Sequence, residues 1–128
     1  NARLNFRQQE ENHIMENIIY NELLYRDYQV DVGIVEIKEV NDNGIRRQKQ
    51  LEVDFVVNKG FERYYIQSAF EMATIEKVEQ EKKSLLKISD SFKKIIVIKD
   101  DIKPYRDENG IYIIGIFDFL LNPNSMDI

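Results

Sequence analysis

The sequence contains one run that is apolar at four consecutive positions, Ile95-Ile96-Val97-Ile98. In an extended chain successive side chains point to opposite faces of a sheet, so this run presents aliphatic groups to both faces. Such a strand needs cover on both sides and is typical of the interior of a sheet with helices on its two faces. We therefore expect an α/β domain in which residues 95–98 form an inner strand.

The rest of the chain alternates between helical and extended patterns. Apolar residues at three- and four-residue spacings indicate helices, and period-two alternation indicates strands. The expected elements are, in order, a helix over 13–26 capped by Asn12, strands from residue 28, over 50–57 and over 63–69, a helix from Thr74 to about residue 87, strands over 95–98 and 111–114, and a short helix over 118–121. This order predicts an α/β (α+β) fold with an αβββαβ core, in which helices flank a mixed sheet.

Turn signals set the expected pairing of the first three strands, which we predict to form an antiparallel meander. Asn41-Asp42-Asn43-Gly44 is one turn, and Lys59-Gly60 is the second. With Lys59-Gly60 as a two-residue loop, Asp54 pairs with Tyr65, and Gln67 lies about 7–8 Å away diagonally on the same face. Asp54 and Gln67 are therefore expected to share a site.

Length and composition fit a single domain. The 128 residues are enough for one hydrophobic core. We expect 1–11 to be a flexible lead-in that begins with an Asn1-Ala2 remnant of a removed tag, 12–122 to be the folded domain, and 123–128 to be a loose tail.

Several classes of function are excluded or disfavoured by composition. The sequence has no cysteine, which excludes disulfides, thiol nucleophiles and cysteine-based zinc sites. The net charge of -5 disfavours a domain that holds nucleic acid by charge alone, although it leaves room for a local basic patch. The apolar runs are far shorter than the roughly 20 residues of a membrane span, so we expect no membrane partner.

Five segments together resemble a known family. They are 15–24 (Met-Glu-Asn-Ile-Ile-Tyr-Asn-Glu-Leu-Leu), 52–56 (Glu-Val-Asp-Phe-Val), 65–67 (Tyr-Ile-Gln), 86–90 (Leu-Lys-Ile-Ser-Asp) and 110–120. In their order and spacing they are similar to the PD-(D/E)XK nuclease-like domain at the carboxy end of bacterial AAA-type ATPases. The resemblance implies a restriction-endonuclease-like core, a cytoplasmic bacterial protein, and an ATPase module as partner. ATP would bind in that module, since this sequence has no Gly-rich loop that ends in Lys-Ser/Thr.

The resemblance also implies a metal site for Mg²⁺ or Mn²⁺. Asp54 matches the metal-binding aspartate, Glu16 matches the helical glutamate, and Gln67 stands where the family has Glu or Asp. The lysine that would activate water is replaced by Ala69, and Lys77 on the following helix is the alternative source of that charge. Loss of this ammonium removes a group worth orders of magnitude in rate.

Other polar residues have simpler interpretations. Glu22 falls near the centre of the apolar stripe of the first helix and needs a partner there, or its carboxylate must reach solvent. His13 is the one histidine, and we expect it at the surface or as a cap. The basic group 46–49 is expected to be a solvated turn that could touch phosphates. Tyr64 and Tyr65 should face opposite sides of a strand, and core packing is expected for both.

We therefore expect an accessory, non-catalytic nuclease-like domain of an ATPase that recognises a substrate or partner, with nucleic acid as one candidate. The first alternative is a Mg²⁺-dependent DNA endonuclease that uses Glu16, Asp54 and Gln67. The second alternative is a structural domain that docks against its own ATPase module. Ala69 favours the non-catalytic accessory domain over the endonuclease.

Overall fold

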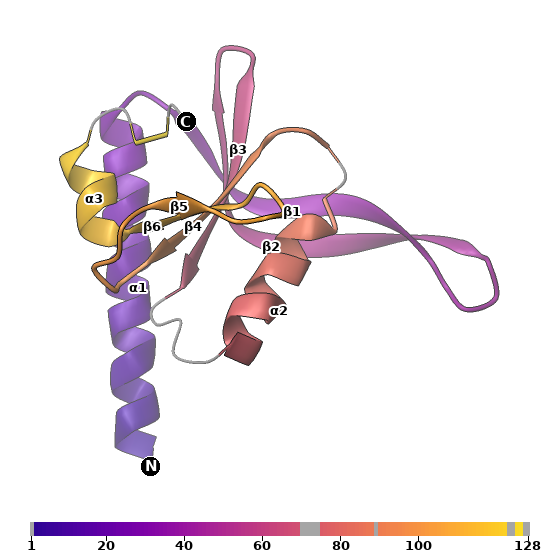
Figure 1. The fold of residues 1–128 in the computed structure, drawn as a ribbon, viewed down its shortest axis with the longest axis horizontal. Helices are drawn as coiled ribbons and strands as arrows, with labels where there is room; N and C mark the ends of the chain where they lie inside the picture. The colour runs from indigo at the N-terminus through magenta and orange to yellow at the C-terminus, as the bar shows by residue number, and fades with distance from the viewer. Residues whose placement is uncertain (1, 70–74, 89, 123–124, 127–128) are drawn as a thin grey trace.

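A computed structural model describes residues 2–69, 75–88, 90–122 and 125–126 of the chain. Figure 1 shows the arrangement of the elements, with a long N-terminal helix beside a twisted sheet. In order, the elements are α1 (Ala2–Tyr25), β1 (Gln29–Val40), β2 (Arg46–Lys59), β3 (Glu62–Ala69), α2 (Ile75–Leu86), β4 (Lys93–Ile98), β5 (Tyr105–Arg106), β6 (Tyr112–Gly115) and α3 (Ile116–Leu121). The observed order confirms the αβββαβ core that the sequence predicts.

Over the described residues the strands form a six-stranded mixed sheet in the order β1-β2-β3-β4-β6-β5. Strands β1, β2 and β3 form an antiparallel meander, as predicted. Strand β4 then runs parallel to β3, and β6 runs parallel to β4. The change from antiparallel to parallel pairing occurs at β3, which is therefore the strand that joins the two halves of the sheet.

The apolar run of β4 lies inside the sheet, which confirms its predicted place. Ile95 and Val97 belong to a core that includes Met15 and Leu23 of α1. Ile96 and Ile98 belong to a second core on the other face, which includes the α2 residue Leu85. All four side chains of the run are buried. The helices therefore cover both faces of β4, as its composition requires.

Helix α1 is longer than the sequence predicts. It begins at Ala2 rather than near His13, so position 12 lies within the helix instead of capping it, and 2–11 are helical rather than a flexible lead-in. The error arose because the apolar stripe that identified this helix begins only at Ile14.

Among the described residues, no helix has both the length and the apolar character needed to span a bilayer. Thr74, the expected cap of α2, lies outside the described residues.

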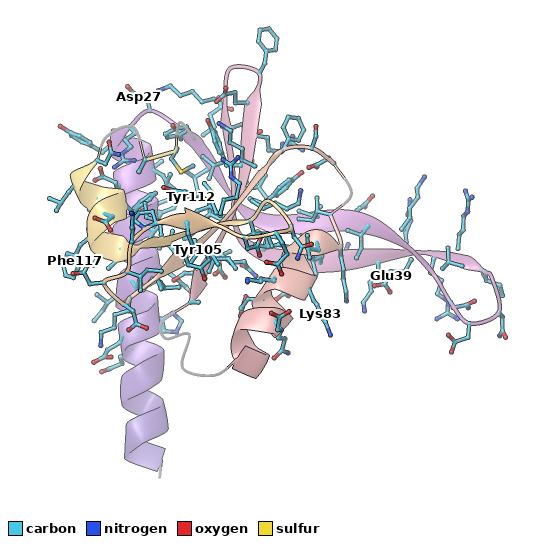
Figure 2. The ribbon with its side chains drawn as sticks, viewed as in Figure 1. Asp27, Glu39, Lys83, Tyr105, Tyr112 and Phe117 are labelled. Atoms are coloured by element: carbon cyan, nitrogen blue, oxygen red, sulfur yellow. The ribbon has the colours of Figure 1, made fainter. Side chains whose placement is uncertain are left out.

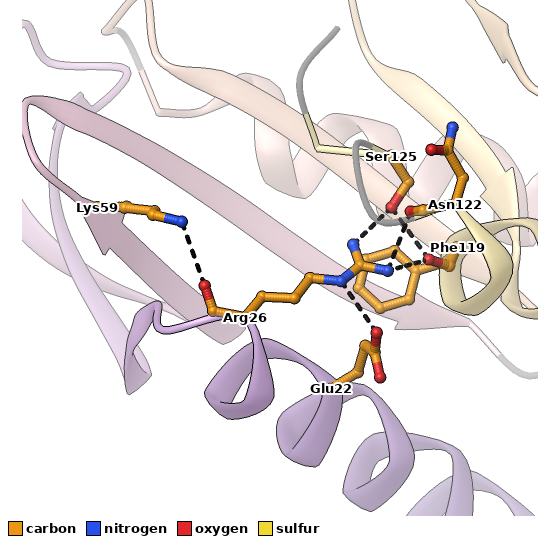
Figure 3. Close-up of polar contacts among 6 residues, drawn as sticks. All are labelled: Glu22, Arg26, Lys59, Phe119, Asn122 and Ser125. Atoms are coloured by element: carbon orange, nitrogen blue, oxygen red, sulfur yellow. Dashed lines mark hydrogen bonds and ion pairs between the residues drawn. The ribbon is translucent and has the colours of Figure 1, made fainter.

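Arg26, directly after α1, connects this helix to the C-terminal part of the chain (Figure 3). Its guanidinium donates to the carbonyl oxygens of Phe119 and Asn122 and to the hydroxyl of Ser125, and it pairs with Glu22 at 3.0 Å. Its side chain is 7% exposed. Glu22 thus has the partner that its place on the apolar stripe requires.

The same contacts correct the expectation of a loose C-terminal tail. Ser125 and Met126 are buried, and the Ser125 hydroxyl also donates to the carbonyl oxygen of Phe119. Polar groups of the tail satisfy the buried Arg26 side chain, which apolar periodicity does not reveal.

We expect Arg26→Ala to lower the free energy of unfolding by about 2–4 kcal/mol, because it leaves Glu22 without its cationic partner and removes a charged donor from the carbonyl oxygens of Phe119 and Asn122. Chemical denaturation followed by circular dichroism measures this loss. The control is Lys59→Ala, which removes an exposed donor to the Arg26 carbonyl oxygen and should cost no more than about 1 kcal/mol. Equal losses in the two variants would contradict the anchoring role of Arg26.

Candidate functional site

Strands β2 and β3 separate at Asp54 and Gln67. Their backbone pairing runs from Lys59–Glu62 to Phe55–Ile66. At the next position two side chains replace the backbone ladder. The N–H of Asp54 donates to Gln67 Oε1 at 2.8 Å, and the N–H of Ser68 donates to Asp54 Oδ2 at 2.7 Å. Asp54 and Gln67 are thus brought together where the two strands diverge.

The observed β2–β3 register differs from the predicted one by two residues. Tyr65 pairs with Val56 rather than with Asp54, so the loop is Gly60-Phe61 instead of Lys59-Gly60. A shift by two does not by itself move any side chain to the other face. It moves Gln67 from a diagonal position to one directly across from Asp54.

A β-bulge lies at Asp54 itself. The β1–β2 register changes between the pairs Asp31–Val56 and Gly33–Val53, so that Asp54 and Phe55 of β2 lie opposite one residue of β1. The extra residue is on β2, and the glycine that accommodates it, Gly33, is on β1. A bulge of this kind bends the strand and redirects a side chain, and bulges are common beside functional sites.

The bulge also changes which core each β2 side chain joins. Val53 and Val56 both pack on the face of α2, whereas Phe55 packs on the face of α1. The predicted alternation placed Val53 and Phe55 together. Gly33 permits the bulge because a Cβ there would lie 2.5 Å from Val56 Cγ2.

Glu16 approaches this point from α1. It lines a cleft together with Tyr20, Gly33, Glu52 and Asp54. Burial raises the pKa of the Glu16 carboxyl, and the nearby Asp54 carboxylate raises it further. Glu16 and Asp54, which the family resemblance associates, thus line the same cleft.

The sequence analysis missed Glu81 on α2. Gln67 Nε2 donates to Glu81 Oε2 at 3.4 Å, and burial followed by the Asp54 carboxylate raises the pKa of Glu81. Glu81 lies in a run of charged residues, a pattern that is typical of the solvated face of a helix. The available signal was spacing, since Glu81 precedes the fully buried Leu85 by four residues and so shares its side of the helix.

Gln67 connects the two carboxylate-bearing segments. Its amide oxygen accepts from the backbone of Asp54, while its amide nitrogen donates to Glu81. An ionised glutamate could not donate to Glu81 and would add a further negative charge. A neutral amide at this position therefore stabilises the arrangement of Asp54 and Glu81.

Desolvation dominates the electrostatics of the site. Burial is the largest cause of the raised pKa of Asp54, and the hydrogen bond from the Ser68 N–H opposes it. A divalent cation near Asp54 would relieve this cost, because it stabilises the ionised form. Among the described residues, however, no three acidic or histidine side chains come close enough together to hold a metal ion. Of the expected ligands, Gln67 accepts a hydrogen bond from the Asp54 N–H, and Glu16 lines the same cleft as Asp54.

An apolar contact fills the position at which the resemblance would place a lysine. Ala69 pairs with Ile98 of β4 and packs against the core on the face of α2. The side chain of Lys77, the alternative source of positive charge, is not among those that the structure describes. The β3 strand thus offers a methyl group where an ammonium would be needed.

The other candidate residues are not part of the Asp54–Gln67 contact. His13 lies at the edge of the site, where it is exposed and its Nδ1 is 3.9 Å from a carboxylate oxygen of Glu16. The basic residues 46–49 are exposed on β2, next to the turn that joins it to β1. Tyr64 and Tyr65 are buried on opposite faces, as predicted, and the Tyr65 hydroxyl donates to Asp90. Neither tyrosine is placed to stack on a base.

In a comparison with known proteins, the chain matches one segment of a longer protein. Over 107 residues it is 36% identical to an uncharacterized protein of Haemophilus influenzae, a match that covers 84% of this chain and 22% of that protein. The chain therefore spans about a fifth of the relative's length. No protein-family model matches the sequence.

The raised pKa values of Asp54 and Glu81 predict how stability depends on pH. The folded state holds these protons more tightly than the unfolded chain, so stability falls as pH rises through the folded-state pKa values. Asp54→Asn and Glu81→Gln remove the ionising groups. We expect both variants to lose less stability than the native protein between about pH 4 and about pH 7.

Denaturant unfolding at a series of pH values measures this difference. The control is Glu108→Gln, which changes an exposed loop carboxyl and should follow the native profile. The expectation fails if Asp54→Asn and Glu81→Gln also follow the native profile.

Proposed function

We propose that this chain is a nuclease-like accessory domain of a cytoplasmic bacterial AAA-type ATPase and that it recognises a substrate or partner without cutting DNA. The observation that carries the proposal is the pairing of Asp54 with Gln67 beside Ala69. Both polar side chains are bonded to backbone groups of the neighbouring strand, and the lysine position is apolar. The contact between Asp54 and Gln67 supports the nuclease-like part of the proposal, and the lack of an ammonium on β3 supports its non-catalytic part.

The length of the relative supports a place in a larger protein. The matched region is 22% of that protein, which leaves room for an ATPase module elsewhere in such a chain. ATP would bind in that module. The domain would contribute recognition, and the ATPase would contribute movement or remodelling.

A Mg²⁺-dependent endonuclease is the second candidate, and a specific observation favours it. Glu16 and Glu81 both have pKa values raised by the Asp54 carboxylate, so three acidic groups share one region. A divalent cation would compensate this charge. By the resemblance to nucleases, Glu16, Asp54 and Gln67 would be the ligands of this cation. Binding of Mn²⁺ that is lost in Asp54→Ala would support this candidate.

We expect no cleavage of plasmid, branched or single-stranded DNA by the chain in Mg²⁺ or Mn²⁺ above the level of an Asp54→Ala control. The chemical reason is the absence of a lysine at position 69, and the net charge of -5 also disfavours capture of DNA. Gel assays of product over time measure this. Cleavage that disappears in Asp54→Ala would establish the endonuclease instead.

Binding measurements separate recognition from a purely structural role. Fluorescence anisotropy with duplex, branched and single-stranded DNA, repeated over a range of salt concentrations, measures any nucleic-acid affinity. Binding to one of these forms would identify the class of substrate. If none binds, DNA is excluded, and co-purification of the domain with its ATPase module tests docking as its function.

A further inference from the structure

The β1–β2 hairpin extends beyond the rest of the sheet (Figure 1). Strand β1 is the first in the sheet order, and β2 pairs with β3 only from Phe55 onward in the described residues. The outer edge of β1 therefore offers backbone N–H and C=O groups that another strand could pair with.

The exposed face of β1 has a regular pattern. Ile34 and Val40 are 60% and 65% exposed, and the exposed charged residues Glu36 and Lys38 lie between them. On the opposite face Ile37 is buried and Val35 packs beside it in the core. Glu39, which is labelled on the extended hairpin in Figure 2, lies on the same side as Ile37. Its carboxylate pairs with Lys49 and with Lys87, which follows α2. The row from Ile34 to Val40 is thus apolar at both ends and oppositely charged in the middle.

We propose that a second copy of this chain pairs antiparallel with β1, about a two-fold axis at Ile37. In this register Ile34 lies opposite the partner's Val40, and Glu36 lies opposite the partner's Lys38. The symmetry repeats both pairs, because an isologous contact uses the same residues on each subunit. Two apolar pairs and two ion pairs then form on one face, and the exposed Ile34 and Val40 side chains become covered.

Neighbouring registers are worse. Side chains opposite each other in an antiparallel sheet lie on the same face, so the axis can move only by one whole residue. An axis at Glu36 places Glu36 against its own copy and Ile34 against Lys38. An axis at Lys38 places two lysines together. Like charges directly opposite are destabilising, which selects Ile37.

The outer edge of β2 is a poor alternative for self-pairing. Its part beyond the pairing with β3 carries Arg46, Arg47 and Lys49 on consecutive or alternate positions. Two copies aligned along this edge would bring basic side chains together. Charge therefore directs self-association to β1.

The irregularity between Asp31 and Gly33 limits the paired segment to 34–40. A contact of this length is small compared with the ~1,600 Å² of a standard interface. The dimer should therefore be in equilibrium with monomer, with a dissociation constant in the micromolar range.

Sedimentation velocity over a series of protein concentrations tests the proposal on the whole chain. The native protein should show a concentration-dependent dimer. Glu36→Lys and Lys38→Glu should each raise the dissociation constant by about tenfold or more, because each creates like-charge pairs across the axis. A native protein that stays monomeric at all concentrations would overturn the proposal.

Mixing the two variants provides the decisive comparison. One copy then carries two lysines and the other two glutamates at positions 36 and 38, so the mixture should regain the native dissociation constant. Lys103→Glu and Glu108→Lys are matched reversals at exposed loop positions and should leave the dimer unchanged. Circular dichroism verifies that each variant is folded. A mixture that remains monomeric would overturn the register and the proposal with it.

Discussion

The four apolar side chains of β4 point alternately to the two faces of the sheet, and both faces must be covered to keep them from water. Helices α1 and α3 cover one face and α2 covers the other. These same helices carry Glu16 and Glu81 to opposite sides of the point where β2 and β3 diverge. The hydrophobic requirement of Ile95–Ile98 thus fixes the layers from which the polar site is built.

Periodicity predicted the layers, and turn signals predicted the meander, whereas the association of Glu16 with Asp54 was implied only by the family resemblance. The register of the second hairpin was not predictable in this way, because Gly60 and the fully exposed Phe61 form its loop. From the sequence pattern, an apolar residue at a loop tip is easily assigned to the following strand. Because the error in the β2–β3 register was two residues, it did not by itself move any side chain to the other face of the sheet.

Features that depend on partners distant in sequence were the ones missed. The bulge adds a residue to β2, although its compositional signal, Gly33, is on β1. Glu81 on α2 accepts a hydrogen bond from Gln67 on β3, and Ser125 accepts a hydrogen bond from Arg26. In each case a polar contact outweighs the local pattern, and one sequence does not show which distant groups will meet.

The bonds of Arg26 also have a consequence for biosynthesis. Their partners lie 93 to 99 residues later in the chain. During translation α1 and Arg26 leave the ribosome before Phe119, Asn122 and Ser125 are made, so the Arg26 guanidinium remains solvated until these partners appear. Helix α1 can therefore dock stably only after residues 119–125 have been synthesised, and until then its apolar side is exposed to chaperones and to neighbouring nascent chains.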